Sequence, residues 1–319
     1  MQSTDAPATR ARTAGFRRSL RQWFDSGEGQ AAIEGKRSDR IDLVRTIPFA
    51  LLHLACLGVL WTGVSPVALA VAVALYALRM FALTGFYHRY FSHRTFRTSR
   101  AVQFTFACIG AACVQRGPLW WAAHHRNHHR RADTPADPHS PTQHGFLWSH
   151  MGWFLTPGAF RTELERVPDL ARYPELRWLD RYDIAVPVLL AVLLYGLGAL
   201  LQHAAPHLHT SGAQMLVWGF FVSTVVLFHA TVTINSLAHR YGSRRFATHD
   251  DSRNNAWLAL LTFGEGWHNN HHFFPGSARQ GFRWWEVDLT WYGLEFMAML
   301  GLVSDLKPVP AWVLHRAER

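Results

Sequence analysis

Four apolar runs, each close to the length that crosses a lipid bilayer, constrain this 319-residue chain more than any other feature. They cover residues 47–63, 66–84, 184–201 and 213–234. A helix needs ~20 apolar residues to span the hydrocarbon core. One such run is also compatible with a buried hairpin of a soluble protein, but four runs in two pairs make that alternative a poor one. We therefore expect an all-α integral membrane protein whose four transmembrane helices form two hairpins.

The distribution of arginine predicts the orientation of these helices. The segment before the first run, the long central segment and the tail after the fourth run are Arg-rich, whereas the connectors 64–65 and 202–212 contain neither Lys nor Arg. Under the positive-inside rule, both termini and the central segment are then cytoplasmic. The scarcity of Lys, present only at Lys36 and Lys307, and the compact chain favour a multi-pass protein of a bacterial inner membrane.

These patterns divide the chain into five segments. We expect a cytoplasmic N-terminal segment (1–42), a first transmembrane hairpin (43–84), a cytoplasmic segment (85–181), a second hairpin (182–234) and a cytoplasmic C-terminal segment (235–319). We expect the cytoplasmic parts together to form one helical domain. The apolar stretch 101–114 is too short to span, so it is expected to be interfacial or buried.

The N-terminal segment contains no apolar core of the kind that a secretory signal requires. Its apolar residues Phe16, Leu20, Trp23 and Phe24 recur at helical spacing among arginines. This pattern is typical of a short helix that lies on an anionic membrane surface. A disordered basic tail explains it equally well.

Composition excludes several functional classes. The three cysteines contain no C-x-x-C pair, which argues against a disulfide framework, a cysteine zinc site and a built-in iron–sulfur cluster. The formal charge of +10 suggests nucleic-acid binding at first sight. Because the positive-inside topology already accounts for the arginines, we expect a lipid bilayer and no nucleic acid as the partner.

Twenty histidines are the unusual feature of the composition, and nine of them fall in short clusters. Each cluster lies in a predicted cytoplasmic segment or where a span leaves the membrane. The clusters are HRYFSH, HRNHH, NSLAH and HNNHH, which contain His88 and His93; His125, His128 and His129; Asn235 and His239; and His268, His271 and His272.

The spacing within the clusters favours a metal site. Residues at i, i+3 and i+4 share one helical face, so each H-x-x-H-H box directs three imidazoles to one side, and Asn235 and His239 behave alike. His88 and His93 are five apart, about 140° around an α-helix, so they converge only if the helix is distorted or ends there. Nine imidazoles suit two ions with four or five nitrogen ligands each, with Asn235 reaching one through a water.

Imidazole ligands alone leave Zn, Fe, Cu and Ni open. Soluble di-iron bundles use paired Glu-x-x-His motifs, and here Glu265 and His268 form the single example. A membrane location and an all-nitrogen binuclear site point to oxygen activation on a lipid chain. Zinc has no redox chemistry for that task.

The motifs HRYFSH, WWAAHHRNHH, ADPHSP, NSLAH and GEGWHNNHH, in this order, resemble those of the membrane fatty acid desaturases. The H-x-x-x-x-H and N-S-x-x-H motifs resemble the stearoyl-CoA (Δ9) acyl-CoA desaturase branch, in a bacterial form, and the resemblance extends over roughly residues 40–310. It implies two iron ions that cycle between Fe²⁺ and Fe³⁺, O2 as co-substrate, and a cis double bond introduced into a saturated fatty acyl chain. It also implies that the nine histidines are the metal ligands, with Asn235 water-mediated and no further catalytic residue.

No haem motif, G-x-G-x-x-G or cysteine cluster is present. We therefore expect an external electron donor of the ferredoxin, rubredoxin or cytochrome b5 type, with its reductase.

The resemblance has matches and departures around the substrate. Gln115 and Trp121 match positions that line the acyl tunnel, whereas Val232 replaces a tunnel Trp. Ala123 and His124 replace an Arg-Asp pair that holds the CoA headgroup in animal acyl-CoA desaturases. Other arginines could contact the phosphates instead, or they could be surface residues that only reflect the positive-inside rule. These candidates are Arg116, Arg126, Arg130 and Arg131.

Three alternatives remain open at this point. The acyl chain is carried either on CoA, which the resemblance favours, or on a phospholipid. A related di-iron hydroxylase or acetylenase would use the same histidines. A non-enzymatic membrane metal-binding protein is a more distant alternative, because transport places polar ligands at mid-membrane and only His53 and His229 lie within the predicted spans.

Overall fold

The computed structural model describes residues 20–27 and 40–316 and is almost entirely helical. Within this part of the chain, four helices are long and apolar enough to cross a membrane. They run over Leu43–Thr62, Pro66–Ser92, Ala185–Ala204 and Gly212–Ser236. The number and place of the four expected spans are thereby confirmed. Their pairing as hairpins, their orientation and the five-segment division remain predictions.

Each of the first two spans combines more than one helical form. The first consists of α2 (Leu43–Leu54), the 3₁₀ turn η2 (Ala55–Gly58) and α3 (Val59–Thr62). The second consists of α4 (Pro66–Phe81) and the π-helix η3 (Ala82–Ser92). Asp42 caps α2 and Ser65 caps α4, so that first-turn N–H groups are bonded before the chain enters the apolar region.

The third span is a single continuous helix, whereas the fourth is built of several helical segments. The third is the single helix α11 (Ala185–Ala204), followed by the turn η7 (Pro206–Leu208). The fourth consists of α12 (Gly212–Gln214), the π-helical stretch η8 (Met215–Val222) and α13 (Ser223–Ser236). Ser211 and Gln214 form a capping box at its beginning.

The stretch η8 lies at the centre of the membrane part, since α4, α11 and the first span all contact it. Close approach depends on small residues. A Cβ atom on Gly58 would lie 2.9 Å from the Val217 side chain, and one on Gly198 would lie 2.5 Å from the Ser211 carbonyl. Helices in lipid associate through such close packing because no hydrophobic driving force operates between them.

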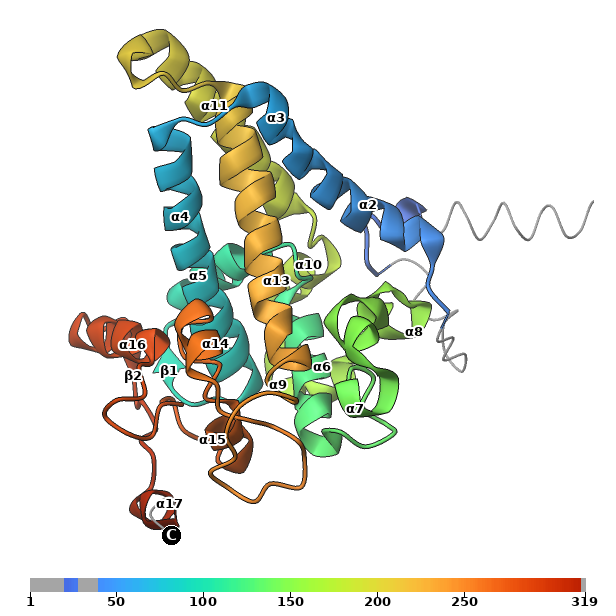
Figure 1. The fold of residues 1–319 in the computed structure, drawn as a ribbon, viewed down its shortest axis with the longest axis vertical. Helices are drawn as coiled ribbons and strands as arrows, with labels where there is room; N and C mark the ends of the chain where they lie inside the picture. Colours follow the sequence, from blue (N-terminus) through green and yellow to red (C-terminus); the bar gives the residue numbers. More distant parts are fainter. Residues whose placement is uncertain (1–19, 28–39, 317–319) are drawn as a thin grey trace, which may run out of the picture.

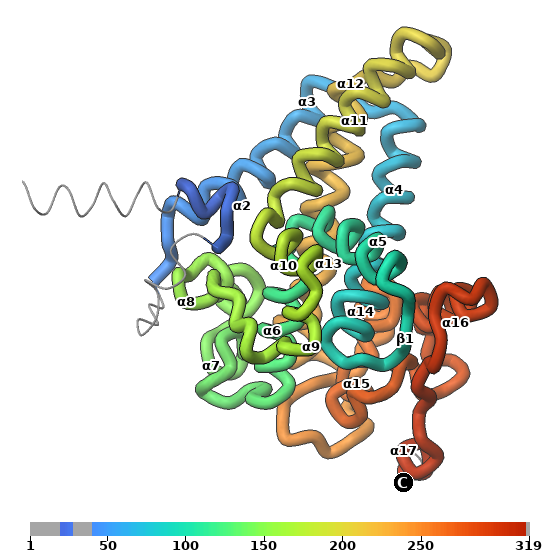
Figure 2. Tube along the Cα trace, turned by 180° about the vertical axis from the view of Figure 1, so that it is seen from behind, coloured from blue at the N-terminus to red at the C-terminus, as the bar shows by residue number. Residues whose placement is uncertain are grey.

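The remaining elements gather at the end of the molecule opposite to η7 and the 63–65 connector (Figure 1). They lie beneath the four spans, and a view from behind shows the same arrangement (Figure 2). A two-stranded antiparallel sheet pairs Arg97 with Ser304. The elements are β1 (Arg97–Thr98), α5 (Arg100–Ala111), α6 (Pro118–Arg131), α7 (Pro141–His144), η4 (Trp148–Gly152), η5 (Trp153–Leu155), α8 (Pro157–Phe160), η6 (Leu164–Arg166), α9 (Pro168–Ala171), α10 (Pro174–Arg181), α14 (Ala256–Leu261), α15 (His268–Phe273), α16 (Leu289–Met299), β2 (Val303–Ser304) and α17 (Ala311–Arg316).

The main core surrounds η3, every residue of which is buried. The rings of Phe86 and Phe106 stack at 3.9 Å between η3 and α5. Helix α5 covers most of the apolar stretch 101–114 and is only 12 residues long, so the expectation of a non-spanning buried segment is confirmed. Helices α6 and α10 complete this core.

Two features are typical of the membrane surface. On α14 and α16, the large side chains of Trp257, Phe296 and Met299 are exposed, as expected where aromatic and apolar groups meet the lipid–water boundary. At the N-terminal side, residues 20–24 form a helical turn whose Trp23 Nε1 donates to the Val44 carbonyl at 3.2 Å. Phe16 lies outside the described residues, so the expected interfacial helix remains a prediction beyond this turn.

The arrangement gives a direct test of orientation. Reporter fusions placed at Ser65 and at His207 should report an external position, and a fusion at Thr142 an internal one, because Arg-rich segments are retained in the cytoplasm. Topology reporters in a bacterial host measure this. An external Thr142 would contradict the orientation that we expect.

Candidate metal centre

The first histidine pair is brought together by a local change of helix type. The backbone of η3 follows the wider π pattern, in which the hydrogen bond connects residues five apart. His88 and His93, also five apart, therefore meet with their ring centroids 4.9 Å from each other. The expectation that these two residues converge only through distortion is confirmed, and its cause is the π-helix.

The other imidazoles come from α6, α15 and the turn after α13. The nine form two groups, in each of which the candidate ligand atoms all lie within 4.8 Å of one another. We call them the five-histidine group and the four-histidine group. The former contains His88, His93, His125, His129 and His271, and the latter His128, His239, His268 and His272.

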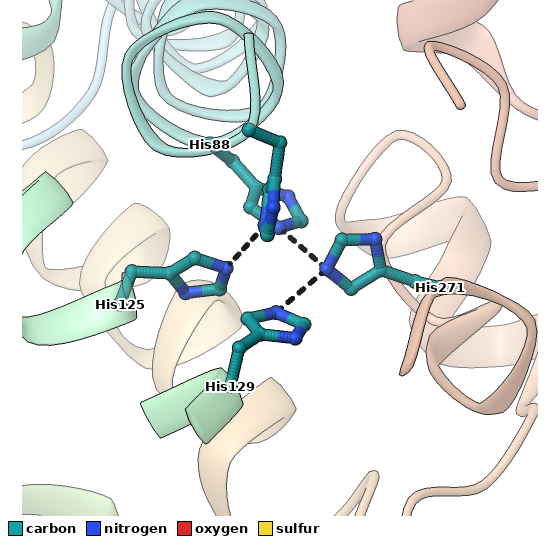
Figure 3. Close-up of side chains that lie close together, drawn as sticks. His88, His125, His129 and His271 are labelled. Carbon is teal, nitrogen blue, oxygen red and sulfur yellow. Dashed lines mark hydrogen bonds between the residues drawn. The ribbon is translucent and has the colours of Figure 1, made fainter. Parts of the chain in front are cut away.

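Each H-x-x-H-H box is divided between the two groups. On α6, His125 and His129 belong to the five-histidine group and His128 to the other. On α15, His271 belongs to the five-histidine group while His268 and His272 belong to the other. Figure 3 shows His88, His125, His129 and His271 pointing toward one another from η3, α6 and α15. Two short helices thus position ligands for both metal ions.

The nitrogen positions fit coordination. Four Nε2 pairs approach closely: His93 and His125 at 2.8 Å, His88 and His271 at 2.9 Å, His129 and His271 at 2.9 Å, and His239 and His268 at 3.0 Å. Ligands at right angles around an ion with metal–nitrogen bonds of about 2.1 Å lie about 3 Å apart. The groups therefore have the spacing of ligands that share an ion.

The protonation state of the buried histidines is also compatible with metal binding. Burial lowers the pKa of His125, His129 and His271 well below the usual range. These imidazoles are thus neutral near pH 7, as a metal ligand must be. The Nε2 atom of His272 is buried and has no hydrogen-bond partner among the described residues. A buried polar atom without a partner is costly, and a metal ion would satisfy this one.

Carboxylates hold the rings from the outside. Asp137 accepts from His128 Nδ1 at 2.9 Å, Asp133 from His239 Nδ1 at 2.7 Å, and Asp250 from His272 Nδ1 at 2.8 Å. Glu265 pairs in the same way with His88 Nδ1. Each contact directs Nε2 inward and strengthens the imidazole as a donor.

The three aspartates are ionised. Burial alone raises the pKa of such groups, but the neighbouring histidine rings and backbone N–H groups outweigh it. They hold the pKa of Asp133, Asp137 and Asp250 well below the usual range.

Sequence reasoning missed all four carboxylates as functional residues. Asp137 lies in the ADPHSP motif and Glu265 in GEGW, but neither position indicates which histidine it contacts. Asp250 is 22 residues from His272 and Asp133 is 106 residues from His239. The available signal was the general rule that a metal-bound histidine donates its second nitrogen to a carboxylate.

The two asparagines of HNNHH have a structural role. Asn269 Oδ1 accepts from the backbone N–H groups of Arg245 and Phe246 at 2.9 and 2.8 Å. Asn270 accepts from Asn254 Nδ2 at 2.7 Å and donates to Glu286 at 3.0 Å. These bonds fix α15 against the loop that carries Asp250, so the motif positions its own ring partners.

An apolar cavity reaches both groups. His88 and His125 line it from one group, and His128 and His268 from the other. Asn235 lies on its wall, and its water-mediated role stays a prediction. Further lining comes from Met80, Leu83, Thr84, Trp121, Thr231, Ile234, Thr262 and Glu265.

The two candidate substrate residues lie at or beside this cavity. Trp121 stacks on His125 at 5.0 Å between ring centroids and lines the cavity directly. Gln115 donates to Thr231 at 3.2 Å and so supports the wall. The replacements at Ala123 and His124 line a second cavity, on the other side of α6.

The arginines proposed as phosphate contacts differ in their surroundings. Arg126 bonds Asp169 and the carbonyls of Phe91 and Ser92, and so supports the end of η3. Arg116 is paired with Asp183 at 3.2 Å. Arg130 and Arg131 are exposed.

The fold and the site define a class: a membrane protein with four candidate spans and two groups of histidines that could each hold a metal ion. The sequence matches the fatty acid desaturase family over residues 64–302. The chain belongs to this family. It is 35% identical to the Arabidopsis thaliana protein named Delta-9 acyl-lipid desaturase 1, over 89% of each chain. It is 36% identical to the Anabaena variabilis sn-1 stearoyl-lipid 9-desaturase, over 84% of this chain and 94% of the relative. It is 39% identical to the Anemone leveillei Acyl-CoA 5-desaturase AL21, over 86% and 82%.

The metal centre makes a first mutational prediction. His271→Ala removes a ring that contacts both His88 and His129, so roughly one of two bound ions should be lost. Activity should fall on the order of 100-fold or more. Metal analysis of the purified protein and a product assay measure this.

His207→Ala, in the exposed turn at the opposite end, is the matched control and should change neither quantity. Equal effects of the two substitutions would show that the histidine groups are not the metal centre.

Proposed function

We propose that this desaturase family member is a di-iron, O2-dependent enzyme that introduces a cis double bond at Δ9 of a saturated fatty acyl chain. One observation carries the proposal: two groups of imidazoles, of five and four, border one apolar cavity. The apolar lining of the cavity suits contact with part of an alkyl chain, and the histidines would hold two ions beside it.

Iron is the metal that this chemistry requires. Two iron ions bound there would supply O2-dependent oxidation, which zinc, having one stable oxidation state, does not. The overall reaction takes two hydrogens from adjacent carbons, two electrons from a donor and two protons from water, and reduces O2 to two molecules of water. Imidazoles bind a metal ion in their neutral form, so nine of them suit Fe²⁺, and the carboxylates behind them suit the increase in charge on oxidation.

The protein's own residues position the chain. Trp121 and Ile234 give apolar walls, and Thr231 and Asn235 give polar positions close to the metal groups. Burial of most of the cavity lining excludes bulk water from the reacting carbons. Asn235 is proposed to hold a water toward the four-histidine group.

The carrier of the acyl chain is the finer question. The sequence resemblance favours acyl-CoA, but the second cavity supports a membrane lipid. Among the described residues that line it, Arg166 is the only Arg or Lys, and it pairs with Glu163. A CoA headgroup carries several phosphate charges, which favour multiple cationic contacts. Two of the relatives above are named as lipid desaturases.

The electron donor is proposed to be a separate protein of the ferredoxin, rubredoxin or cytochrome b5 type with its reductase. The site is proposed to face the cytoplasm of a bacterial cell from its inner membrane. Both proposals follow from the absence of a redox cofactor motif in the sequence and from the arginine distribution.

The metal and the product give the decisive test. Purified protein should contain close to two iron ions per chain, and activity should scale with iron content, O2 and an added electron-transfer chain. The product should be two hydrogens lighter than the substrate, with no added oxygen, by mass spectrometry. Zinc-loaded protein is the control and should bind substrate without converting it. Zinc-only protein that desaturates, or iron-replete protein that yields only hydroxylated chains, would overturn the proposal.

A second test concerns the carrier. Iron-loaded enzyme should convert stearoyl chains on a glycerolipid at least about tenfold more efficiently in kcat/KM than stearoyl-CoA, because one missing charge-assisted contact is worth about that factor. Matched stearoyl substrates in nanodiscs measure the ratio. A preference for stearoyl-CoA would show that the acyl chain is carried on CoA, and it would not contradict the desaturase proposal.

A further inference from the structure

We propose that the two metal positions are electrically unequal and that the four-histidine position stabilises the ion of higher charge. This inference rests on the proposed di-iron function. It concerns the carboxylates behind the ligands, which act through the histidines as positioning residues.

Three carboxylates surround the four-histidine group. Asp137, Asp133 and Asp250 each accept from the Nδ1 of a different ring, and at most 5% of each carboxylate side chain is exposed. Asp133 and Asp250 also accept from hydroxyl or backbone groups of Ser140, Asp251 and Ser252. Within residues 20–27 and 40–316, none of the three forms an ion pair with an Arg or Lys side chain. Their ion-pair partners in the described structure are the imidazoles, which must be neutral once they bind a metal ion. In the metal-bound state these three charges then have no ion-paired side-chain cation among the described residues.

The five-histidine group is different. Glu265 is the one carboxylate that contacts its rings in the described structure, through His88. Arg89 lies 3.1 Å from Glu265 and 2.9 Å from Asp288, and its side chain is 1% exposed. Two carboxylates thus share one guanidinium. The formal charge behind this group is one negative charge rather than three.

Charge balance then separates the two positions. Three buried anions without a protein cation are costly unless a compensating charge lies beside them. A trivalent ion among four neutral imidazoles would neutralise the three aspartates. The charge of a divalent ion among the five imidazoles would already be larger than the single negative charge behind them. The electrostatic energy of each ion depends directly on these nearby charges, so oxidation is easier at the four-histidine position.

The test removes charge and keeps the hydrogen bond. Asp250→Asn and Asp133→Asn leave an amide oxygen that still accepts from Nδ1, and Glu265→Gln is the matched change at the other group. In iron-loaded full-length protein, a redox titration followed by Mössbauer spectroscopy should resolve two midpoint potentials. Either aspartate variant should shift the more negative midpoint to higher values. Glu265→Gln should leave that midpoint in place. A single shared midpoint, or the same midpoint moved by all three variants, would overturn the inference.

A second measurement covers variants that lose iron and does not depend on desaturase activity. Ga³⁺ and Zn²⁺ are redox-inert ions that differ in charge. For the apoprotein, Asp250→Asn should lower Ga³⁺ affinity about tenfold more than Zn²⁺ affinity, whereas Glu265→Gln should change the two more equally. Equal losses of both ions in Asp250→Asn would indicate a purely structural role and overturn the inference. If the desaturase proposal is wrong, the product assay will show it. The Ga³⁺ and Zn²⁺ affinities can still be interpreted, because they are measured without desaturase activity.

Discussion

The hydrogen bond from a histidine Nδ1 to a buried carboxylate is the interaction on which the centre of this molecule depends. An imidazole ring can rotate, and either nitrogen can carry its proton. Each carboxylate accepts a hydrogen bond from one nitrogen and leaves the other nitrogen directed inward, as Asp133 does for His239 at 2.7 Å. Asp133, Asp250 and Glu265 are distant in sequence from the histidines they contact, so the centre forms only when the elements outside the membrane spans are correctly packed.

The membrane part and the metal centre are joined through one continuous element. The second span passes without interruption from α4 into η3, so the helix that crosses the lipid also carries His88. The wider π turn is energetically poor in isolation and is common at functional sites. Here every residue of η3 is buried, and Arg89 bonds Glu265, Asp288 and the Ala278 carbonyl at its end. Tertiary contacts therefore maintain a backbone form that local propensity does not favour.

Much of this arrangement could be predicted from the sequence, and the limits have physical causes. Hydropathy and length identify spans because lipid requires uninterrupted apolar helices. Spacing identifies the histidines because i, i+3 and i+4 share a face. The division of each box between two ions could not be predicted, since His128 and His129 differ by only one helical step and tertiary packing decides which ion each meets. Asp133 and Asp250 could not be assigned because their partners are distant in sequence.

The divided boxes explain how short helices can hold two ions rigidly. A ligand from α6 or α15 cannot move without moving a ligand of the other ion, because each helix contributes to both groups. In the proposed di-iron centre, helix geometry would set the separation of the two ions, and the carboxylates behind each group would influence their charges. The cavity lined by Ala123 and His124 lies on the other side of α6 from the cavity beside the histidines. Under the proposed function, the two faces of one helix would then carry separate tasks, so that the carrier could change while the nine histidines stay the same.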